Sequence, residues 1–529
     1  MIIIIYYNRG TVMNKKIELG LFVEEIENEA DVKNKILIIG SGNAAMTAGI
    51  AALENGCEVE ILEKAPESLS GGNTKYTAGA MRFCFNGIDD LFPLLKNLDD
   101  DRLKNTEFGS YSPESFSNDL LSFNDGRPLS DEQIVLVDES YDAMRWLSGH
   151  NIKFDPIYDR QSFEKEGKHV FWGGLALSAT EEGIGLFEQE RDAFLKLGGK
   201  IRYETEVTSI AQYEGKVCGV YADKIFFKGN AVVLATGGFE ANENMRAEFV
   251  GENWRNAKVR GTPHNTGDGL RMAFALGAKK YGVFSGCHAT PMDLNMPDFG
   301  GLDLPPIQRK LYRKICYFLG IMVNIGGQRF VDEGENFRNY TYAQFGRKVI
   351  EQPKSQAWQI FDSKVMDLLY DEYTFEKATF VEASSLDSLT DKMINVDKKS
   401  VLQTIADFNL ACSSNKAFDP TVLDGKKTSG LALPKSNWAQ PISDPPFRAY
   451  PVTGGITFTY GGLKITNDGS VLSEDDSRIP GLFACGELVG GVFFNGYPGG
   501  SGLTSGLVFG RIAGLGASRY SKEYAKTYK

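Results

Sequence analysis

The sequence has little histidine, no paired cysteine motif and no concentrated positive charge. Four histidines and seven cysteines occur among 529 residues, and no two cysteines are spaced as CxxC. Iron–sulfur clusters, zinc ribbons and attached haem c use closely spaced cysteines, so no metal centre is expected. An odd number of dispersed cysteines is typical of reduced thiols, which predicts a cytoplasmic protein.

Two further absences limit the partners. Lysine and arginine number 57 against 69 acidic residues, a net charge of −12, and they form no long block. Phosphate backbones are bound by concentrated positive charge, so no nucleic-acid partner is expected. The apolar run Met1–Tyr7 is far shorter than the ~20 residues of a membrane span and lacks signal-peptide features. No stable membrane insertion is expected. Residues 1–34 are expected to be a leader that is either disordered or, if Met13 is the true start, mis-annotated before Met13.

The sequence does contain 58 glycines and 42% hydrophobic residues, which suits an α/β protein with many tight turns. Its length predicts at least two domains. The strongest local signal is the stretch Lys35–Glu63. It reads in order as a strand, a GxGxxA fingerprint, a helix, a second strand and an acid: Ile36–Ile39, Gly40–Ala45, Ala44–Asn55, Val59–Leu62 and Glu63.

Each residue type in this unit has a physical reason. Gly40 permits the tight turn, and Gly42 lets the backbone approach a pyrophosphate. Ala45 is small enough for close packing of helix and strand, and the helix N-terminus presents free N–H groups to phosphates. Glu63 can accept hydrogen bonds from ribose hydroxyls. The unit therefore predicts a Rossmann-type dinucleotide site.

Later segments favour FAD over NAD as the dinucleotide. A hydroxyl-rich loop follows at Gly71–Arg82, a buried strand at Ala231–Phe239, an acid-bearing strand at Gly481–Glu487 and a helix start at Ser501. The candidate cofactor contacts are Gly40, Gly42, Asn43, Ala44, Ala45, Glu63, Lys64, Gly71, Gly72, Asn73, Thr77, Ala78, Gly79, Val207, Thr236, Gly237, Asp268, Glu487, Ser501, Gly502, Leu503 and Thr504.

The order of these motifs resembles the fumarate reductase/succinate dehydrogenase flavoprotein superfamily, over roughly residues 35–520. Four stretches resemble most closely its tricarballylate dehydrogenase subgroup: Gly71–Phe83, Gly327–Ala343, Tyr450–Leu463 and Gly486–Gly510. The resemblance implies a Rossmann-type FAD-binding domain with an inserted α+β capping domain. The expected divisions are 35–287 and 444–529 for the FAD-binding domain and 288–443 for the cap. Helical patterns are expected within the cap at Lys364–Leu369 and Val401–Asn409.

The resemblance also supplies four catalytic candidates. Arg338, after the run Arg329–Glu333, matches a proton-transferring arginine of soluble fumarate reductases, one residue out of register; a surface arginine paired with a nearby glutamate is the alternative. His288 matches a substrate-binding histidine, and Arg82 is a further carboxylate-binding candidate. Tyr497 stands where fumarate reductases have an arginine, and Thr457–Gly462 lacks their histidine pair. A Tyr-Pro-Gly at this point is also similar to 3-ketosteroid dehydrogenases.

Together these features imply an enzyme that oxidises or reduces a CH–CH bond, with a tricarballylate-to-cis-aconitate dehydrogenase as the main interpretation. The alternatives are a fumarate reductase-like or other activated-alkene reductase, a 3-ketosteroid dehydrogenase-like enzyme and a non-catalytic flavin electron carrier. No histidine occurs in Asn73–Gly79, where membrane succinate dehydrogenases attach FAD, so non-covalent FAD is expected. The implied partners are a small carboxylate substrate and an external electron carrier, for which a membrane-associated iron–sulfur protein is the expectation.

Overall fold

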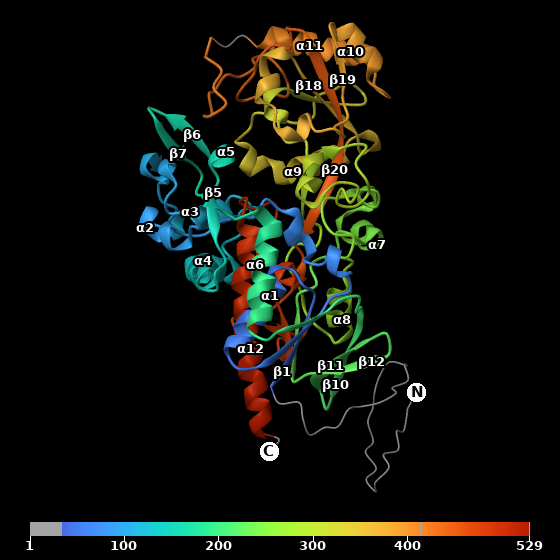
Figure 1. Ribbon diagram of the computed structural model, residues 1–529. Helices are drawn as coiled ribbons and strands as arrows, with labels where there is room; N and C mark the ends of the chain where they lie inside the picture. Colours follow the sequence, from blue (N-terminus) through green and yellow to red (C-terminus); the bar gives the residue numbers. More distant parts are fainter. Residues whose placement is uncertain (1–33, 413–414, 528–529) are drawn as a thin grey trace.

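The computed structural model describes residues 34–412 and 415–527, so the predicted leader lies almost entirely outside the described residues. Figure 1 shows an elongated molecule in which two parts are stacked end to end. The lower part contains β1, α1 and the long helix α12, and the upper part contains β18, β19, α10 and α11. This mixed architecture confirms the predicted α/β fold class.

The lower part is built on a six-stranded sheet in the order β22-β23-β13-β1-β2-β9. All neighbours are parallel except the edge strand β22. The strands span Ser470–Leu472, Arg478–Ala484, Ala231–Leu234, Lys35–Ile39, Glu58–Leu62 and Lys200–Arg202. Ile36, Leu37 and Ile38 are fully buried, as expected of a central parallel strand covered on both faces. The predicted strand–helix–strand unit is present.

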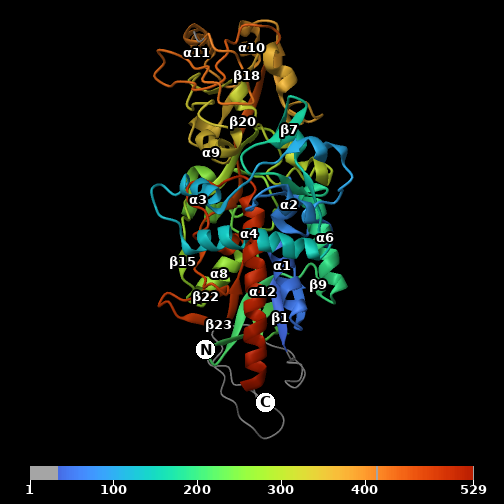
Figure 2. The same ribbon diagram turned by 90° about the vertical axis from the view of Figure 1, so that its left-hand side faces the viewer.

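Helices α1 (Asn43–Glu54) and α12 (Ser501–Thr527) pack closely beside this sheet. Gly506, Gly510 and Gly514 repeat every four residues and so share one face of α12. A Cβ on Gly510 would lie 2.1 Å from the Oγ1 of Thr47, and one on Gly514 would lie 2.2 Å from the carbonyl oxygen of Ala48. The repeat therefore lets the two backbones approach. Helix α4 (Asp131–Gly149) crosses α12 in Figure 2.

The upper part has its own sheet, in the order β14-β20-β18-β17, with β16 and β19 also paired to β20. The strands span Lys258–Val259, Phe447–Thr459, Ala357–Phe361, Ile321–Asn324, Cys287–Asp293 and Val381–Ala383. The long strand β20 pairs first with β18 and β19, and then with β16. It thereby carries the chain from the upper part down to the lower one (Figure 1).

The predicted cap boundaries, His288 and Ser443, fall inside β16 and shortly before β20. Helix α11 (Lys398–Ala411) contains the predicted pattern Val401–Asn409. The pattern Lys364–Leu369 instead forms a short 3₁₀ turn at Ser363–Leu368, where the side chain of Asp362 accepts a hydrogen bond from the backbone N–H of Lys364.

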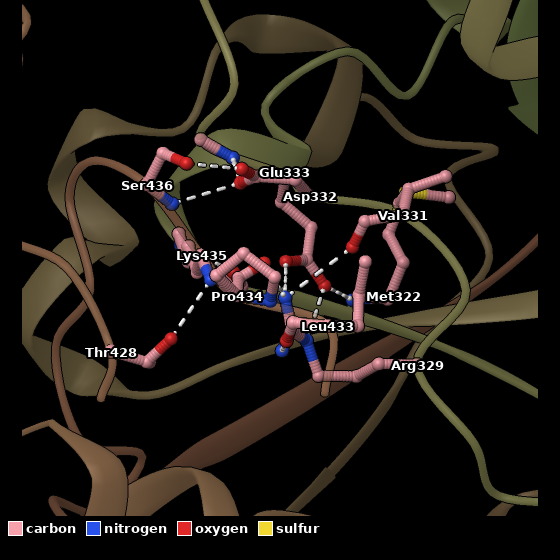
Figure 3. A network of polar contacts seen from close by, with 12 residues as sticks. Met322, Arg329, Val331, Asp332, Glu333, Thr428, Leu433, Pro434, Lys435 and Ser436 are labelled. Carbon is pink, nitrogen blue, oxygen red and sulfur yellow. Dashed lines mark hydrogen bonds and ion pairs between the residues drawn. The ribbon is translucent and has the colours of Figure 1, made fainter. Parts of the chain in front are cut away.

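The run Arg329–Glu333 forms a buried polar network within the upper part (Figure 3). The Arg329 guanidinium pairs with Glu333 at 2.5 Å and donates to the carbonyl oxygen of Leu433 at 2.9 Å. Asp332 accepts a hydrogen bond from the backbone N–H of Ser436 at 2.9 Å. Both carboxylates are therefore used within the protein. Arg329 and Asp332 fix the loop after β17 to a segment about 100 residues later, ahead of helix α9 (Arg338–Ile350).

Candidate active site

One large cavity of about 340 Å³ lies where the predicted cofactor segments meet. Its lining includes the following candidate cofactor contacts: Gly40, Gly42, Asn43, Ala44, Glu63, Lys64, Gly72, Asn73, Thr77, Ala78, Val207, Thr236, Gly237, Asp268, Glu487, Gly502 and Leu503. Five candidates lie outside the lining: Ala45, Gly71, Gly79, Ser501 and Thr504. A volume of this size is typical of small-molecule and cofactor sites.

The glycines of the fingerprint have different roles. Gly40 has φ +100°, and a Cβ there would lie 2.4 Å from the carbonyl oxygen of Ala235. It is therefore required by the turn and by the neighbouring strand. Gly42 has φ −71°, and a Cβ added there would have the Oγ1 of Thr74 as its nearest neighbour, at 3.5 Å. Nothing in the fold requires a glycine there, so the open space in front of Gly42 belongs to the cavity.

Glu63 follows β2 and is held rigidly beside this turn. Its carboxylate accepts hydrogen bonds from the Oγ of Ser41 at 2.5 Å and from the backbone N–H of Ala65 at 2.7 Å. The Lys64 ammonium pairs with Asp268 at 2.5 Å and so ties the end of β2 to helix α8 (Asp268–Ala275). Each Glu63 oxygen has a second lone pair, which is free to accept a ribose hydroxyl.

A buried carboxyl pair lies at another point of the site. Glu487 lines the cavity and accepts hydrogen bonds from the N–H and hydroxyl of Thr459, at 2.7 and 3.0 Å. Glu240, which no sequence motif marks, accepts from Asn73 at 2.7 Å and Asn265 at 2.6 Å. Burial raises the pKa of Glu487 to about 7, and burial beside Glu487 raises the pKa of Glu240 well above its usual value. The pair therefore holds a proton at neutral pH.

These groups fit FAD. The space before Gly42 admits a pyrophosphate, Glu63 is an acceptor for ribose, and helix α12 begins at Ser501 with its Gly502 and Leu503 on the cavity wall. The first N–H groups of an α-helix have no intrahelical partner and favour anions or electron-rich atoms. The acceptors, glycines and helix ends thus match the chemical groups of the dinucleotide.

Four arginines from separate segments also line the cavity: Arg160, Arg260, Arg313 and Arg338. One carboxylate, Glu372, lies among them, 2.6 Å from Arg313 and 3.5 Å from Arg160. Burial, partly offset by Glu372, lowers the pKa of Arg313 to about 10, so it stays charged at neutral pH. Four cations with one buried anion leave this end of the cavity positive. We call these four residues the arginine cluster.

Arg338 is the member with most capacity for a ligand. It starts helix α9, whose N-cap residue Phe337 makes no side-chain capping hydrogen bond. Within the described parts of the chain its guanidinium has no hydrogen bond or ion pair, and it lies over the ring of Tyr370, 5.1 Å from the centroid. The alternative of pairing with Glu333 or Glu335 is not seen, since Glu333 is bound by Arg329. A guanidinium with unused donors beside a helix N-terminus favours a carboxylate.

Tyr497 lines the cavity, but His288 does not. The Tyr497 hydroxyl bonds that of Tyr342 at 2.7 Å. His288 is 1% exposed and stacks on Phe458 at 5.3 Å, with neither ring nitrogen hydrogen-bonded. Burial holds the pKa of His288 well below its usual value, so the ring is neutral. This placement differs from the substrate contact expected of His288, because Phe458 stands in front of it.

Arg82 also differs from its expected place. It is fully buried, and its guanidinium donates to the carbonyl oxygens of Gly499 and Gly173, each at 2.7 Å. The guanidinium also pairs with Asp119 at 3.4 Å, so the residue anchors the loop before α12, and it is not among the residues that line the cavity. The three arginines missed from sequence, Arg160, Arg260 and Arg313, carry no local motif that would have identified them.

Known proteins resemble this chain over most of its length. A family model described as "FAD binding domain" matches residues 35–503. The fumarate reductase (cytochrome) of Shewanella frigidimarina is 27% identical over 501 residues, covering 92% of this chain and 77% of the relative. The vinyl phenol reductase of Lactiplantibacillus plantarum is 24% identical, covering 92% and 97%.

A solved structure, the open conformation of a flavocytochrome c3 fumarate reductase, superposes with a TM-score of 0.69 at 23% identity, covering 93% of this chain and 79% of that one. The fold is therefore the one predicted. These findings confirm FAD as the cofactor, the fumarate reductase-like superfamily, and an FAD-dependent oxidoreductase. No helix among the described residues is long and apolar enough to cross a bilayer. The cofactor-binding part of the cavity, formed by β1, β2, α1 and α12, is called the FAD cradle below. Because the family match, this cradle and the fold agree, the chain belongs to the FAD binding domain family.

Proposed function

We propose that this flavoenzyme reduces the C=C bond of an α,β-unsaturated carboxylate. The observation that carries the proposal is Arg338, a guanidinium without a hydrogen bond or ion pair in the described chain, which faces the same cavity as the FAD cradle. The relatives named above are reductases of an alkene or are fumarate reductases, which supports reduction of an activated alkene. Oxidation of tricarballylate, the main interpretation of the sequence, is the less favoured direction and substrate.

The residues that line the cavity also favour a carboxylate substrate over a steroid. A steroid substrate predicts that the segment Tyr312–Leu319 lines an apolar slot, whereas a polycarboxylate predicts arginines there instead. From this segment Arg313 and Ile315 reach the cavity, while Tyr312, Cys316 and Tyr317 are buried elsewhere. A charged guanidinium at this point favours an anionic substrate. The inserted upper part, which covers the cofactor cavity, argues against an electron carrier with no carbon substrate.

The residues of the cavity suggest separate roles in substrate binding and proton transfer. The arginine cluster binds the carboxylate and withdraws electron density through it, which makes the far alkene carbon electrophilic. FAD, when bound and reduced, supplies a hydride to that carbon. Arg338, which the family resemblance associates with proton transfer, then donates a guanidinium proton to the carbon next to the carboxylate. The product gains one hydride and one proton, and the two electrons come from an external donor. Cytoplasmic location and a membrane iron–sulfur donor stay predictions.

The direct test uses the purified holoenzyme without oxygen. Reduced methyl viologen serves as electron donor, and its oxidation is followed after addition of acrylate or fumarate. We expect turnover in the range of about 1–10³ s⁻¹, as for typical enzymes. In the opposite direction, tricarballylate should reduce and so bleach the oxidised flavin. We expect this reduction to be at least about tenfold slower than turnover with the alkene, which is a difference of about 1.4 kcal/mol in activation free energy. Rapid bleaching by tricarballylate, with no alkene accepting electrons, would restore the dehydrogenase interpretation.

FAD attachment gives a separate prediction. The loop Asn73–Gly79 has no histidine, and the cavity-lining His264 belongs to the predicted ribose end, where burial lowers its pKa and Glu63 and Lys64 act on it. We propose that FAD is held without a covalent bond. Acid precipitation should therefore leave all the yellow flavin in the supernatant and none in the protein pellet. Flavin fluorescence in the washed, denatured pellet would contradict this.

A further inference from the structure

The lining of the same cavity also contains a group of aromatic rings, which forms a second wall next to the arginine cluster. Its members, which we call the aromatic box, are Tyr342, Phe458, Tyr460, Phe493 and Tyr497. The ring centroid of Phe458 lies 5.2 Å from that of Tyr497, 5.4 Å from that of Tyr460 and 5.8 Å from that of Phe493. These distances are typical of favourable edge-to-face contacts, so the rings form a preassembled surface.

The aromatic box carries no charge. The hydroxyls of Tyr342 and Tyr497 satisfy one another, and His288 behind Phe458 is buried and neutral. Arg260, which belongs to the arginine cluster, borders the box, 3.4 Å from the Oγ1 of Thr457. A second carboxylate placed among the rings would lose its hydration, and the ring residues themselves offer it no cation, which is costly. A flat apolar group would gain ring contacts at no such cost.

We propose that the substrate is an α,β-unsaturated monocarboxylate with an aromatic ring on its β-carbon. This inference rests on the proposed function and narrows its substrate class. The carboxylate binds the arginine cluster, the ring enters the aromatic box, and the C=C bond lies between the two walls. Hydride is added to the carbon that bears the ring, and a proton to the carbon next to the carboxylate. An external reductant restores the two electrons that the cofactor gives up with the hydride.

A small polycarboxylate does not match this arrangement as well. Fumarate and tricarballylate carry negative charge at both ends, whereas the cavity offers one cluster of cations and one group of uncharged rings. Acrylate has a single carboxylate but leaves the aromatic box unfilled. The three kinds of substrate therefore differ in the group opposite the first carboxylate, which is an aromatic ring, a second carboxylate or hydrogen.

The test compares 3-phenylpropenoate, acrylate and fumarate as oxidants of reduced methyl viologen with the FAD-loaded enzyme. We expect kcat/KM for 3-phenylpropenoate to exceed that of both others by at least about tenfold, since each aromatic contact contributes roughly two- to twelvefold. A preference for fumarate or acrylate would overturn the aromatic substrate but leave the proposed function standing. Failure of all three would overturn the proposed function itself.

A variant tests the aromatic box directly. Phe458→Leu removes a ring but keeps an apolar side chain, and should lower kcat/KM for 3-phenylpropenoate about tenfold and for acrylate less than about twofold. Phe380→Leu, a ring 41% exposed on the upper part, should change neither. Equal losses for both substrates in Phe458→Leu would overturn the proposal. If that variant does not retain the flavin absorbance, Phe493→Leu is judged by the same ratio.

Discussion

Replacing Arg338 with alanine should reduce turnover of an unsaturated carboxylate by about 10³-fold, within the range for loss of a proton donor or an oxyanion-stabilising group. The guanidinium lines the cavity, and no protein group in the described chain occupies its hydrogen-bonding capacity. FAD content should not change, because the cradle is built from β1, β2, α1 and α12. The measurement is viologen oxidation per mole of bound flavin.

Two further variants make the Arg338 result specific. Arg338→Lys keeps a positive charge but loses the planar fork, and should recover only part of the activity, because bidentate carboxylate binding needs a guanidinium. Lys348→Ala, on the same helix α9 and half-exposed beside Glu351, should behave like the unaltered protein. Activity of Arg338→Ala within about threefold of the unaltered protein would remove Arg338 from the mechanism.

The FAD cradle could be predicted from sequence because its signal is local. Gly40, Gly42 and Glu63 lie within one strand–turn–helix–strand unit, where hydrophobic periodicity and turn chemistry determine the structure. The same holds for the start of α12 at Ser501, which follows a glycine-rich turn. Local patterns of this kind do not depend on what packs against them.

The substrate end could not be predicted in the same way. Arg160, Arg260 and Arg313 come from three unrelated segments, and only tertiary packing brings them to one cavity. Arg82 shows the opposite case: an arginine on a predicted flavin loop binds two backbone carbonyls and Asp119 and does not line the cavity. Sequence reveals that a guanidinium is present, but its partners are decided by the elements that surround it.

Gly40 and Gly42 offer a way to separate cofactor binding from folding. Gly42→Ala should weaken FAD binding by at least about tenfold, or about 1.4 kcal/mol, with little effect on the apoprotein. The added Cβ would meet its nearest protein neighbour at 3.5 Å, which is ordinary contact, and φ −71° suits alanine. The methyl group therefore intrudes only on the space that we assign to the pyrophosphate. FAD titration by fluorescence quenching measures the change in Kd.

Gly40→Ala is the matched comparison, because it should damage the fold first. Its Cβ would lie 2.4 Å from the carbonyl oxygen of Ala235, at φ +100°, where alanine is strained. The thermal midpoint of the apoprotein should therefore fall in Gly40→Ala and stay within about 2 °C in Gly42→Ala, since a change of 1 kcal/mol shifts the midpoint of a large domain by about 2–4 °C. If Gly42→Ala binds FAD as tightly as the unaltered protein, the pyrophosphate does not pass over Gly42, and the fingerprint is serving only the packing of β1 against α1.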